Sequence, residues 1–253
     1  MPTDSPAKVL LITGAGRGIG AATARLAATR GYRVGVNYRV NRAAADGVVN
    51  AIRAAGGTAV AIAGDVAVED DVVRMFVECE QALGPITALV NNAGVVDQKA
   101  RVDEMSAARI LRMFAINVFG TMVCAREAVK RMSTAHGGRG GAIVNVSSVA
   151  SRIGSPGEYV DYAAAKGAVD VFTMGLAKEV ATEGIRVNAV RPGIVYTDIH
   201  ASGGQPHRLE RIAPLVPMLR PGDPPEIAGA ILWLLSDEAS YTSGALLDVA
   251  GGR

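Results

Sequence analysis

The segment Thr13-Gly14-Ala15-Gly16-Arg17-Gly18-Ile19-Gly20 lies between an apolar run at residues 9–13 and a helical pattern that begins at Gly18. Glycine permits a sharp turn after a strand, close approach of the backbone to a ligand and tight packing of the next helix. The first N–H groups of that helix and its positive dipole end favour a bound pyrophosphate. The loop could be a purely structural turn, but its place between strand and helix favours a dinucleotide site.

The rest of the chain repeats this alternation of short apolar run and helical pattern. It predicts one α/β domain over residues 1–253, with about seven parallel strands and helices on both faces of the sheet. The expected strands are residues 9–13, 33–37, 59–63, 88–91, 142–147, 186–191 and 245–249. The expected helices include residues 18–29, 42–55, 69–83, 107–132, 159–182 and 225–235.

Composition narrows the classes of protein to consider. Hydrophobic residues make up 49% of the chain and aromatic residues only 4%, which fits an aliphatic core around a parallel sheet. The net charge of +2, with no basic block, argues against a nucleic-acid protein. No apolar run reaches about 18 residues, so we expect no membrane span. Cys79 and Cys124 are expected to be buried free thiols, which indicates a cytoplasmic protein, and the three histidines lack the spacing of a metal site.

A second motif is Tyr162-Ala163-Ala164-Ala165-Lys166, with Ser147 and Ser148 upstream. A tyrosine and a lysine four residues apart share one helical face. A cation beside a phenol lowers its pKa, which makes the tyrosine a usable proton donor and acceptor near neutral pH. A Tyr-x3-Lys match alone is weak evidence, because ordinary helix surfaces supply many. Its weight comes from the glycine loop and from Asn91-Asn92-Ala93-Gly94, which follows another apolar run.

Together these motifs resemble the short-chain dehydrogenase/reductase family over nearly the whole chain, and the Gly-x3-Gly-x-Gly spacing is that of the family. The resemblance implies a Rossmann-like, doubly wound fold and hydride transfer between a nicotinamide and a carbonyl or alcohol substrate. It also implies four catalytic residues. Ser148 would orient the substrate oxygen and Tyr162 would transfer the proton. Lys166 would lower the Tyr162 pKa and hold the nicotinamide ribose, and Asn117 would hold a water near the lysine.

Three of these assignments have alternatives. Ser147 and Ser148 are adjacent, so they face opposite sides if the strand continues, and we choose Ser148. Tyr159 precedes Lys166 by seven residues, a spacing that resembles a divergent enoyl-reductase branch of the family, although the glycine loop favours Tyr162. Asn117 could instead satisfy backbone groups within a helix.

The cofactor type is predicted from the end of the second strand. An NAD-specific site usually places an acid there, but Val36-Asn37-Tyr38-Arg39 contains none. Arg17 and Arg39 suit the 2′-phosphate of NADP(H), unless both are only solvated surface arginines. By resemblance, Asp65-Val66 would contact the adenine ring, and Arg191 to Thr197 would border the nicotinamide. The expected cofactor-binding residues are Gly14, Gly16, Arg17, Gly18, Ile19, Gly20, Asn37, Tyr38, Arg39, Asp65, Val66, Asn92, Ala93, Gly94, Tyr162, Lys166, Pro192, Gly193, Ile194 and Thr197.

Residues 197–217 form the longest segment without a clear strand or core pattern, and they predict a substrate lid. His200, His207, Arg208 and Arg211 in it could meet an anionic substrate or an acidic acyl carrier, or could form a solvated face. Helices 107–132 and 159–182 carry many small or apolar residues, and residues 244–252 are nearly uncharged. These surfaces predict a homotetramer.

The sequence therefore predicts an NADP-dependent oxidoreductase acting on a small-molecule carbonyl or alcohol, with no nucleic-acid or membrane partner. One alternative is an enoyl reductase, dehydratase or epimerase on the same fold. Another is a non-enzymatic NADP-sensing regulator, which would have no use for the set Asn117, Ser148, Tyr162 and Lys166. The sequence does not name the substrate.

Overall fold

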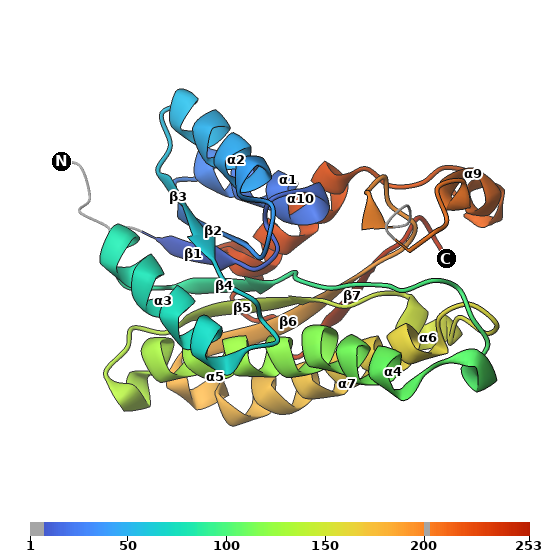
Figure 1. The fold of residues 1–253 in the computed structure, drawn as a ribbon. Coiled ribbons are helices and arrows are strands. Elements are labelled where there is room, and N and C mark those ends of the chain that lie inside the picture. The colour runs from blue at the N-terminus through green and yellow to red at the C-terminus, as the bar shows by residue number, and fades with distance from the viewer. Residues whose placement is uncertain (1–7, 200–202) are drawn as a thin grey trace.

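The computed structural model describes residues 8–199 and 203–253, and these residues form a single parallel sheet of seven strands in the order β3-β2-β1-β4-β5-β6-β7 (Figure 1). The predicted parallel sheet is confirmed, and no predicted strand end is displaced by more than one residue. The strands are β1 (Val9–Ile12), β2 (Arg33–Tyr38), β3 (Ala59–Ala63), β4 (Ala88–Asn91), β5 (Gly141–Val146), β6 (Ile185–Pro192) and β7 (Leu246–Val249).

Strand β1 is apolar along its whole length, and β4 is apolar up to Asn91, because helices cover both faces of the sheet. In β1, Leu10 and Ile12 pack in one core cluster, whereas Val9 and Leu11 pack in the other. This is the two-residue alternation of a strand with both faces buried. Figure 1 shows α1, α2 and α10 on one face, and α3, α5 and α7 on the other. The helices are α1 (Gly18–Thr29), α2 (Arg42–Ala54), α3 (Glu69–Leu83), α4 (Ala107–Phe114), α5 (Gly120–Met132), α6 (Ala150–Ile153), α7 (Val160–Glu179), α9 (Arg208–Ile212) and α10 (Pro224–Leu235).

The chain reverses its direction of winding between β1 and β4, which are hydrogen-bonded neighbours. The loops after these two strands therefore leave the sheet side by side and open a crevice at its carboxyl edge. A backbone hydrogen bond from Thr13 to Val90 (3.0 Å) joins the two loops at their start. The glycine loop and the Asn91–Gly94 loop therefore meet at this switch point.

Two predicted helices differ from the structure. The predicted helix 107–132 is three pieces, because a π-helical segment (Ala115–Phe119) separates α4 from α5. The buried Asn117 lies inside this segment. The predicted helix 159–182 ends at Glu179, and a short 3-10 turn and Gly184, with a φ of 75°, lead into β6. Hydrophobic periodicity cannot detect a single wide turn or the last turn of a helix.

Candidate active site

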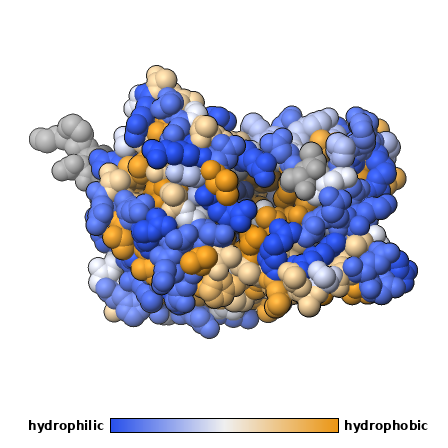
Figure 2. All heavy atoms as spheres, viewed as in Figure 1, coloured by the Kyte–Doolittle hydropathy of each residue, from blue (hydrophilic) through white to orange (hydrophobic). Residues whose placement is uncertain are grey.

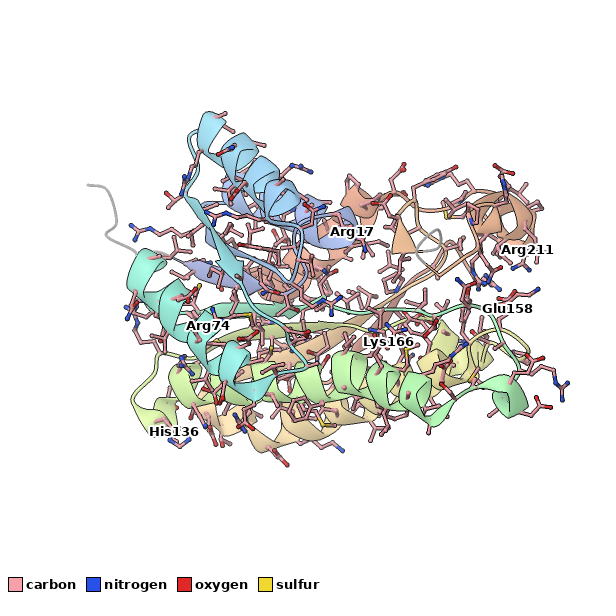
Figure 3. All side chains as sticks on the ribbon, in the orientation of Figure 1. Arg17, Arg74, His136, Glu158, Lys166 and Arg211 are labelled. Carbon is pink, nitrogen blue, oxygen red and sulfur yellow. The ribbon has the colours of Figure 1, made fainter. Side chains whose placement is uncertain are left out.

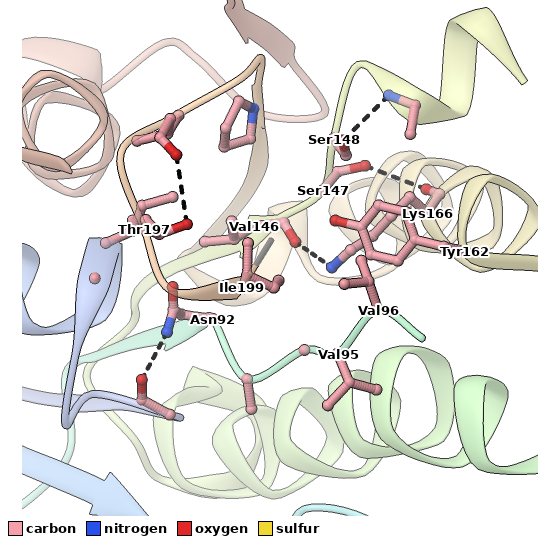
Figure 4. A pocket seen from close by; sticks show the side chains of 18 of the residues that line it. Asn92, Val95, Val96, Val146, Ser147, Ser148, Tyr162, Lys166, Thr197 and Ile199 are labelled. Carbon is pink, nitrogen blue, oxygen red and sulfur yellow. Dashed lines mark hydrogen bonds between the residues drawn. The ribbon is translucent and has the colours of Figure 1, made fainter. Parts of the chain in front are cut away.

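A cavity of about 370 Å³ lies at the carboxyl edge of the sheet (Figure 4). The loops after β1, β4, β5 and β6 and the first turns of α7 form its walls. It brings together most of the site residues that the sequence predicts: Gly14, Arg17, Gly18, Ile19, Asn37, Arg39, Asp65, Val66, Asn92, Ala93, Gly94, Ser148, Tyr162, Lys166, Pro192, Gly193, Ile194 and Thr197.

Four predicted site residues do not line this cavity: Gly16, Gly20, Tyr38 and Asn117. The two glycines permit close packing behind the loop. A side chain on Gly20 would place its Cβ 2.5 Å from the Asn92 amide nitrogen, and one on Gly16 would lie 3.5 Å from the backbone of α2. Tyr38 packs against the core cluster that α1 and α2 cover. Gly16 and Gly20 would therefore contribute to a cofactor site only through the shape of the glycine loop.

Asn37 fixes the turn of the glycine loop. Its side-chain oxygen accepts a hydrogen bond from the Gly14 N–H (3.0 Å), and its amide donates to the Gly64 carbonyl (3.0 Å). On the other side of the loop, the Asn92 amide donates to the carbonyls of Thr13 (2.9 Å) and Gly14 (3.0 Å). Gly14 and Gly18 have φ angles of 62° and 54°, which favour glycine. The loop is therefore held in place by the strand ends on both sides, and its backbone faces the cavity.

Two arginines border the cavity beside this loop, where no acidic residue ends β2. Arg39 lies 3.4 Å from the Asp65 carboxylate, and Arg17 lies 4.0 Å from the Asp198 carboxylate. Both guanidinium groups are more than half exposed, so these ion pairs hold them only weakly. Both side chains therefore border the cavity as cations with weak partners.

Tyr162, Ser148 and Lys166 meet at the far wall of the cavity. Tyr162 and Lys166 share one face of α7, and the lysine Nζ lies 5.6 Å from the centre of the tyrosine ring. Lys166 is buried, and its Nζ donates to the Val146 carbonyl (2.8 Å), as Figure 4 shows. Ser148 hydrogen-bonds with the phenol, whereas the Ser147 hydroxyl is buried and donates to the Lys166 carbonyl (3.2 Å). Ser148 therefore faces the tyrosine, and Ser147 stabilises the helix behind it.

That Lys166 lowers the Tyr162 pKa stays a prediction, because burial has the largest influence on the pKa of this phenol. Burial raises the pKa of Tyr162 to about 12, and the Ser148 hydrogen bond and the Arg208 charge oppose this shift only in part. Burial also lowers the pKa of Lys166 to about 8, against the attraction of Asp170. Helical spacing brings the two groups together, but it does not report how strongly the site removes both from water.

Asn117 connects the wide turn of its helix to the loop after β4. Its side-chain oxygen accepts from the Val95 N–H (3.2 Å), and its amide donates to the carbonyls of Val95 (3.1 Å) and Met113 (3.0 Å). A Cβ on Gly94 would lie 2.8 Å from the Asn117 oxygen and 3.5 Å from Lys166 Nζ. The side chain thus satisfies backbone groups, which was the structural alternative, and it does so next to the lysine.

The end of the cavity away from the glycine loop carries a charged cluster formed by the predicted lid and the residues before α7. The Tyr159 ring lies under the Arg208 guanidinium (4.9 Å), and its hydroxyl accepts a hydrogen bond from Gln205. Glu158 forms ion pairs with Arg208 and with Arg211 (2.6 Å). His207 and Arg211 point to solvent, with side chains 83% and 51% exposed, and His200 lies outside the described residues. Of the described basic residues predicted in the lid, only Arg208 lines the cavity.

The sequence of this chain matches a known protein family over almost its whole length. A family model described as "Enoyl-(Acyl carrier protein) reductase" matches residues 14–253. The chain belongs to the short-chain dehydrogenase/reductase family. Members of this family are oxidoreductases that use nicotinamide cofactors, and the glycine loop at the switch point is where the fold would place the pyrophosphate.

Similar short-chain dehydrogenases/reductases cover almost the same length. The uncharacterized oxidoreductase YgfF of Escherichia coli is 55% identical over 97% of this chain and 99% of its own. A 3-oxoacyl-[acyl-carrier-protein] reductase of Synechocystis is 38% identical over 99% and 98%. A solved structure of a Serratia marcescens short-chain dehydrogenase/reductase mutant is 31% identical, covers 97% of each chain and superposes with a TM-score of 0.89.

Sequence patterns did not identify several other residues that line this cavity. Val95, Val96 and Ile153 add apolar walls, and Arg253 also lines it, whereas Ile199 lies in the predicted lid. Isolated aliphatic residues in loops and in a helix as short as α6 carry no periodic signal. Arg253 reaches the cavity only through the path of the chain after β7, and no local pattern near it points to a site.

Proposed function

We propose that this protein is an NADP-dependent reductase or dehydrogenase that interconverts a small-molecule carbonyl compound and its alcohol. The observation that carries the proposal is the convergence of Ser148, Tyr162 and Lys166 with the glycine loop in one cavity. A nicotinamide cofactor, when bound, supplies the hydride for reduction or accepts it in oxidation.

The side chains at the far wall supply the rest of the reaction. In reduction, the Tyr162 hydroxyl would give its proton to the carbonyl oxygen, and the phenolate left behind would take a proton from solvent before the next turnover. Because burial raises the Tyr162 pKa to about 12, the phenol holds this proton at neutral pH. The Ser148 hydroxyl, which is hydrogen-bonded with the phenol, would donate to the oxygen where negative charge develops. Lys166 lies behind the ring, where its ammonium group would reach a ribose hydroxyl.

Asn117 has a positioning role in this proposal. Its hydrogen bonds to Val95 fix the loop that carries Gly94, and a Cβ on Gly94 would lie 2.8 Å from the Asn117 oxygen. A larger residue at position 94 would therefore displace Asn117, whereas the same Cβ would be in ordinary contact with Lys166 Nζ at 3.5 Å. The loop beside the lysine would thus depend on an amide that does not itself line the cavity.

The proposal is tested by following NADPH absorbance. Ketones, aldehydes, acyl and enoyl thioesters and sugars are supplied in turn with NADPH, alcohols are supplied with NADP⁺, and NADH and NAD⁺ serve as the matched cofactors. We expect turnover of at least one carbonyl class, with NADPH preferred. Saturable NADPH binding without turnover of any class would instead support the regulator alternative.

One observation supports an enoyl reductase as a second candidate. Tyr159 is 4% exposed and lines the same cavity as Tyr162, and the matching family model carries an enoyl-reductase description. However, the Tyr159 hydroxyl is already bonded to Gln205, and its ring lies under Arg208. Reduction of an enoyl thioester in the same panel, with no ketone reduced, would favour this candidate.

A further inference from the structure

Two guanidinium groups border the end of the cavity that the cofactor residues leave open. Arg208 and Arg253 both line the cavity. Arg208 lies over the Tyr159 ring, and its charge acts on the Tyr162 phenol. Arg253 and Arg208 are close enough for their charges to interact. Figure 3 shows Glu158 and Arg211, the neighbours of Arg208, far from Arg17 at the nucleotide end, with Lys166 between. This cationic wall therefore lies beside the reacting groups and apart from the phosphate-binding loop.

The arginine side chains at this wall carry more positive charge than the single carboxylate of Glu158 can balance. The Glu158 carboxylate is shared between Arg208, whose side chain is 12% exposed, and the half-exposed Arg211. Among residues 8–199 and 203–253, no Asp or Glu side chain lies within 4.0 Å of the Arg253 guanidinium, and no side-chain hydrogen bond involves it. Within the part of the chain that the structure describes, the Arg253 guanidinium therefore has no side-chain ion-pair partner, and Glu158 acts on it only from a greater distance.

The position of Arg253 is fixed by a turn after β7 that packs against the lid. Gly251 and Gly252 have φ angles of 64° and 91°, so the chain turns back sharply after β7. The turn packs against the end of the predicted lid. A Cβ on Gly251 would lie 2.9 Å from Val216, a Cβ on Gly252 would lie 3.0 Å from Pro217, and the Met218 N–H donates to the Gly251 carbonyl (3.1 Å).

The Arg253 guanidinium is less favourable in this place than in open solvent. Burial and the nearby Arg208 charge lower the pKa of Arg253, and Glu158 opposes this only in part. A carboxylate between Arg253 and Arg208 would offset the repulsion and would fit the planar fork of each guanidinium. The neighbouring walls are apolar, with Ile153 and Val96 among them, which suits the hydrocarbon part of such a ligand.

The geometry points to a substrate that carries a carboxylate, a small keto acid or hydroxy acid, bound by Arg253 and Arg208 while Tyr162 faces its carbonyl or hydroxyl group. This inference rests on the proposed function, because it names the substrate class of the same site. It makes Arg253 a specificity-determining residue of the reaction.

The test compares a series of aliphatic keto acids, with increasing separation of carbonyl and carboxylate, with the matching keto amides. The amides keep size and shape but lose the charge. We expect the wild type to prefer the acid of at least one length by about tenfold or more in kcat/KM. Arg253→Gln should reduce that preference by about tenfold, mainly through the KM of the acid, and Arg253→Lys should restore part of it. Arg139→Gln, an exposed arginine in the loop before β5, is the control and should leave the preference unchanged.

Equal kcat/KM for acids and amides in the wild type, or an unchanged preference in Arg253→Gln, would overturn the carboxylate site while leaving carbonyl reduction intact. If no carbonyl compound is turned over, the proposed function fails and the site is tested by binding alone. Calorimetry of glutarate with the NADP-saturated protein should then show binding to the wild type and at least tenfold weaker binding to Arg253→Gln. No measurable binding to the wild type would refute the site.

Discussion

The burial of Lys166 in the site makes the free energy of unfolding depend on pH. It is 4% exposed, and its ammonium group donates to the Val146 carbonyl at the end of β5. Burial lowers its pKa from the ordinary 10.5 to about 8. The folded protein therefore releases this proton at a lower pH than the unfolded chain does. Between these two pKa values the unfolded chain holds the extra proton, so the folded state gains stability as pH rises.

Replacing Lys166 by Met should remove this pH dependence. The free energy of unfolding of the wild type, measured relative to Lys166→Met, should rise by roughly 2–3 kcal/mol between about pH 7.5 and pH 10. Denaturant unfolding of both proteins at several pH values measures the difference. Tyr162, whose pKa is raised to about 12, is present in both proteins and cancels in the comparison. Parallel pH profiles would mean that Lys166 is not desolvated as the structure has it.

Arg39 is the residue on which cofactor preference is expected to depend. It borders the cavity beside the glycine loop, and its ion pair with the Asp65 carboxylate at 3.4 Å is exposed, so that it competes only weakly with a phosphate. Arg39→Ala should weaken NADPH binding by about tenfold and leave NADH binding nearly unchanged, because only NADPH carries the 2′-phosphate. Fluorescence titration with both cofactors tests this, with the exposed Arg25→Ala on α1 as control. Tighter NADH than NADPH binding in the wild type would contradict the NADP assignment.

Among the elements, the predicted lid differs most from the sheet in how it is held. In residues 203–217, Ile212 and Val216 pack in a small cluster with Ile194, apart from the two main cores. Polar contacts add to this: Gln205 with Tyr159, and Arg208 and Arg211 with Glu158. Few buried apolar contacts imply a low free energy of local opening. We propose that residues 197–217 close over the substrate.

Hydrogen exchange should report this closure. Without ligands, amides of residues 203–217 should exchange faster than those of β4 and β5, and NADPH with a substrate analogue should slow them by about tenfold or more. The same measurement on α2, which is distant from the substrate end, serves as the internal control. Equally strong protection of the segment with and without ligands would rule out a mobile lid.

The sequence predicts the elements that follow from periodic patterns and turn residues, but it does not predict features that depend on a single contact in the folded protein. The seven strands and the glycine loop follow from apolar runs and from the special conformations of glycine, so their positions agree with the structure. The wide turn at Asn117 depends on the fit of one amide against Val95, and no periodicity encodes it. Arg253 reaches the site through a turn that only the packed lid explains. The raised pKa of Tyr162 likewise arises from desolvation, which depends on the whole fold.

The whole molecule exposes an apolar face on the helices that the sequence predicted for assembly. By length and hydropathy alone, Ala107–Met132 could cross a membrane, and only 33% of its most apolar stretch is buried. Its inner side, with Cys124, Ala125 and Ala128, packs in the core beneath the sheet. Exposed large apolar residues on the outer sides of α4, α5, α7 and the π-helical turn are Leu111, Phe114, Phe119, Met122, Val171 and Met174.

This face suits a second copy of the chain. On α7, a Cβ at Gly167 or at Gly175 would meet no atom within 4 Å, so both glycines leave room for close approach of another helix. Figure 2 shows hydrophobic side chains over α4 and α5 on the face in view. A self-complementary contact through these helices would form a two-fold interface, and we propose that it is part of a homotetramer.

Light scattering tests the assembly. We expect a mass near that of four 26.0 kDa chains, and Val171→Glu should reduce it to a dimer or monomer because a charge would be buried in the contact. Val77→Glu, on α3 at the side of the molecule, is the matched control and should keep the wild-type mass. A wild-type mass near 26 kDa at every concentration would refute the assembly.

The most direct test of the central claim compares turnover of Tyr162→Phe and Tyr159→Phe with NADPH and the best carbonyl substrate of the panel. Both tyrosines line the cavity, and each substitution removes one hydroxyl while keeping the ring. If Tyr162 is the proton donor, Tyr162→Phe should lower kcat by about 10²–10⁴-fold with NADPH affinity retained, and Tyr159→Phe should keep most of the activity. Full activity in Tyr162→Phe, or loss of turnover only in Tyr159→Phe, would contradict the assignment.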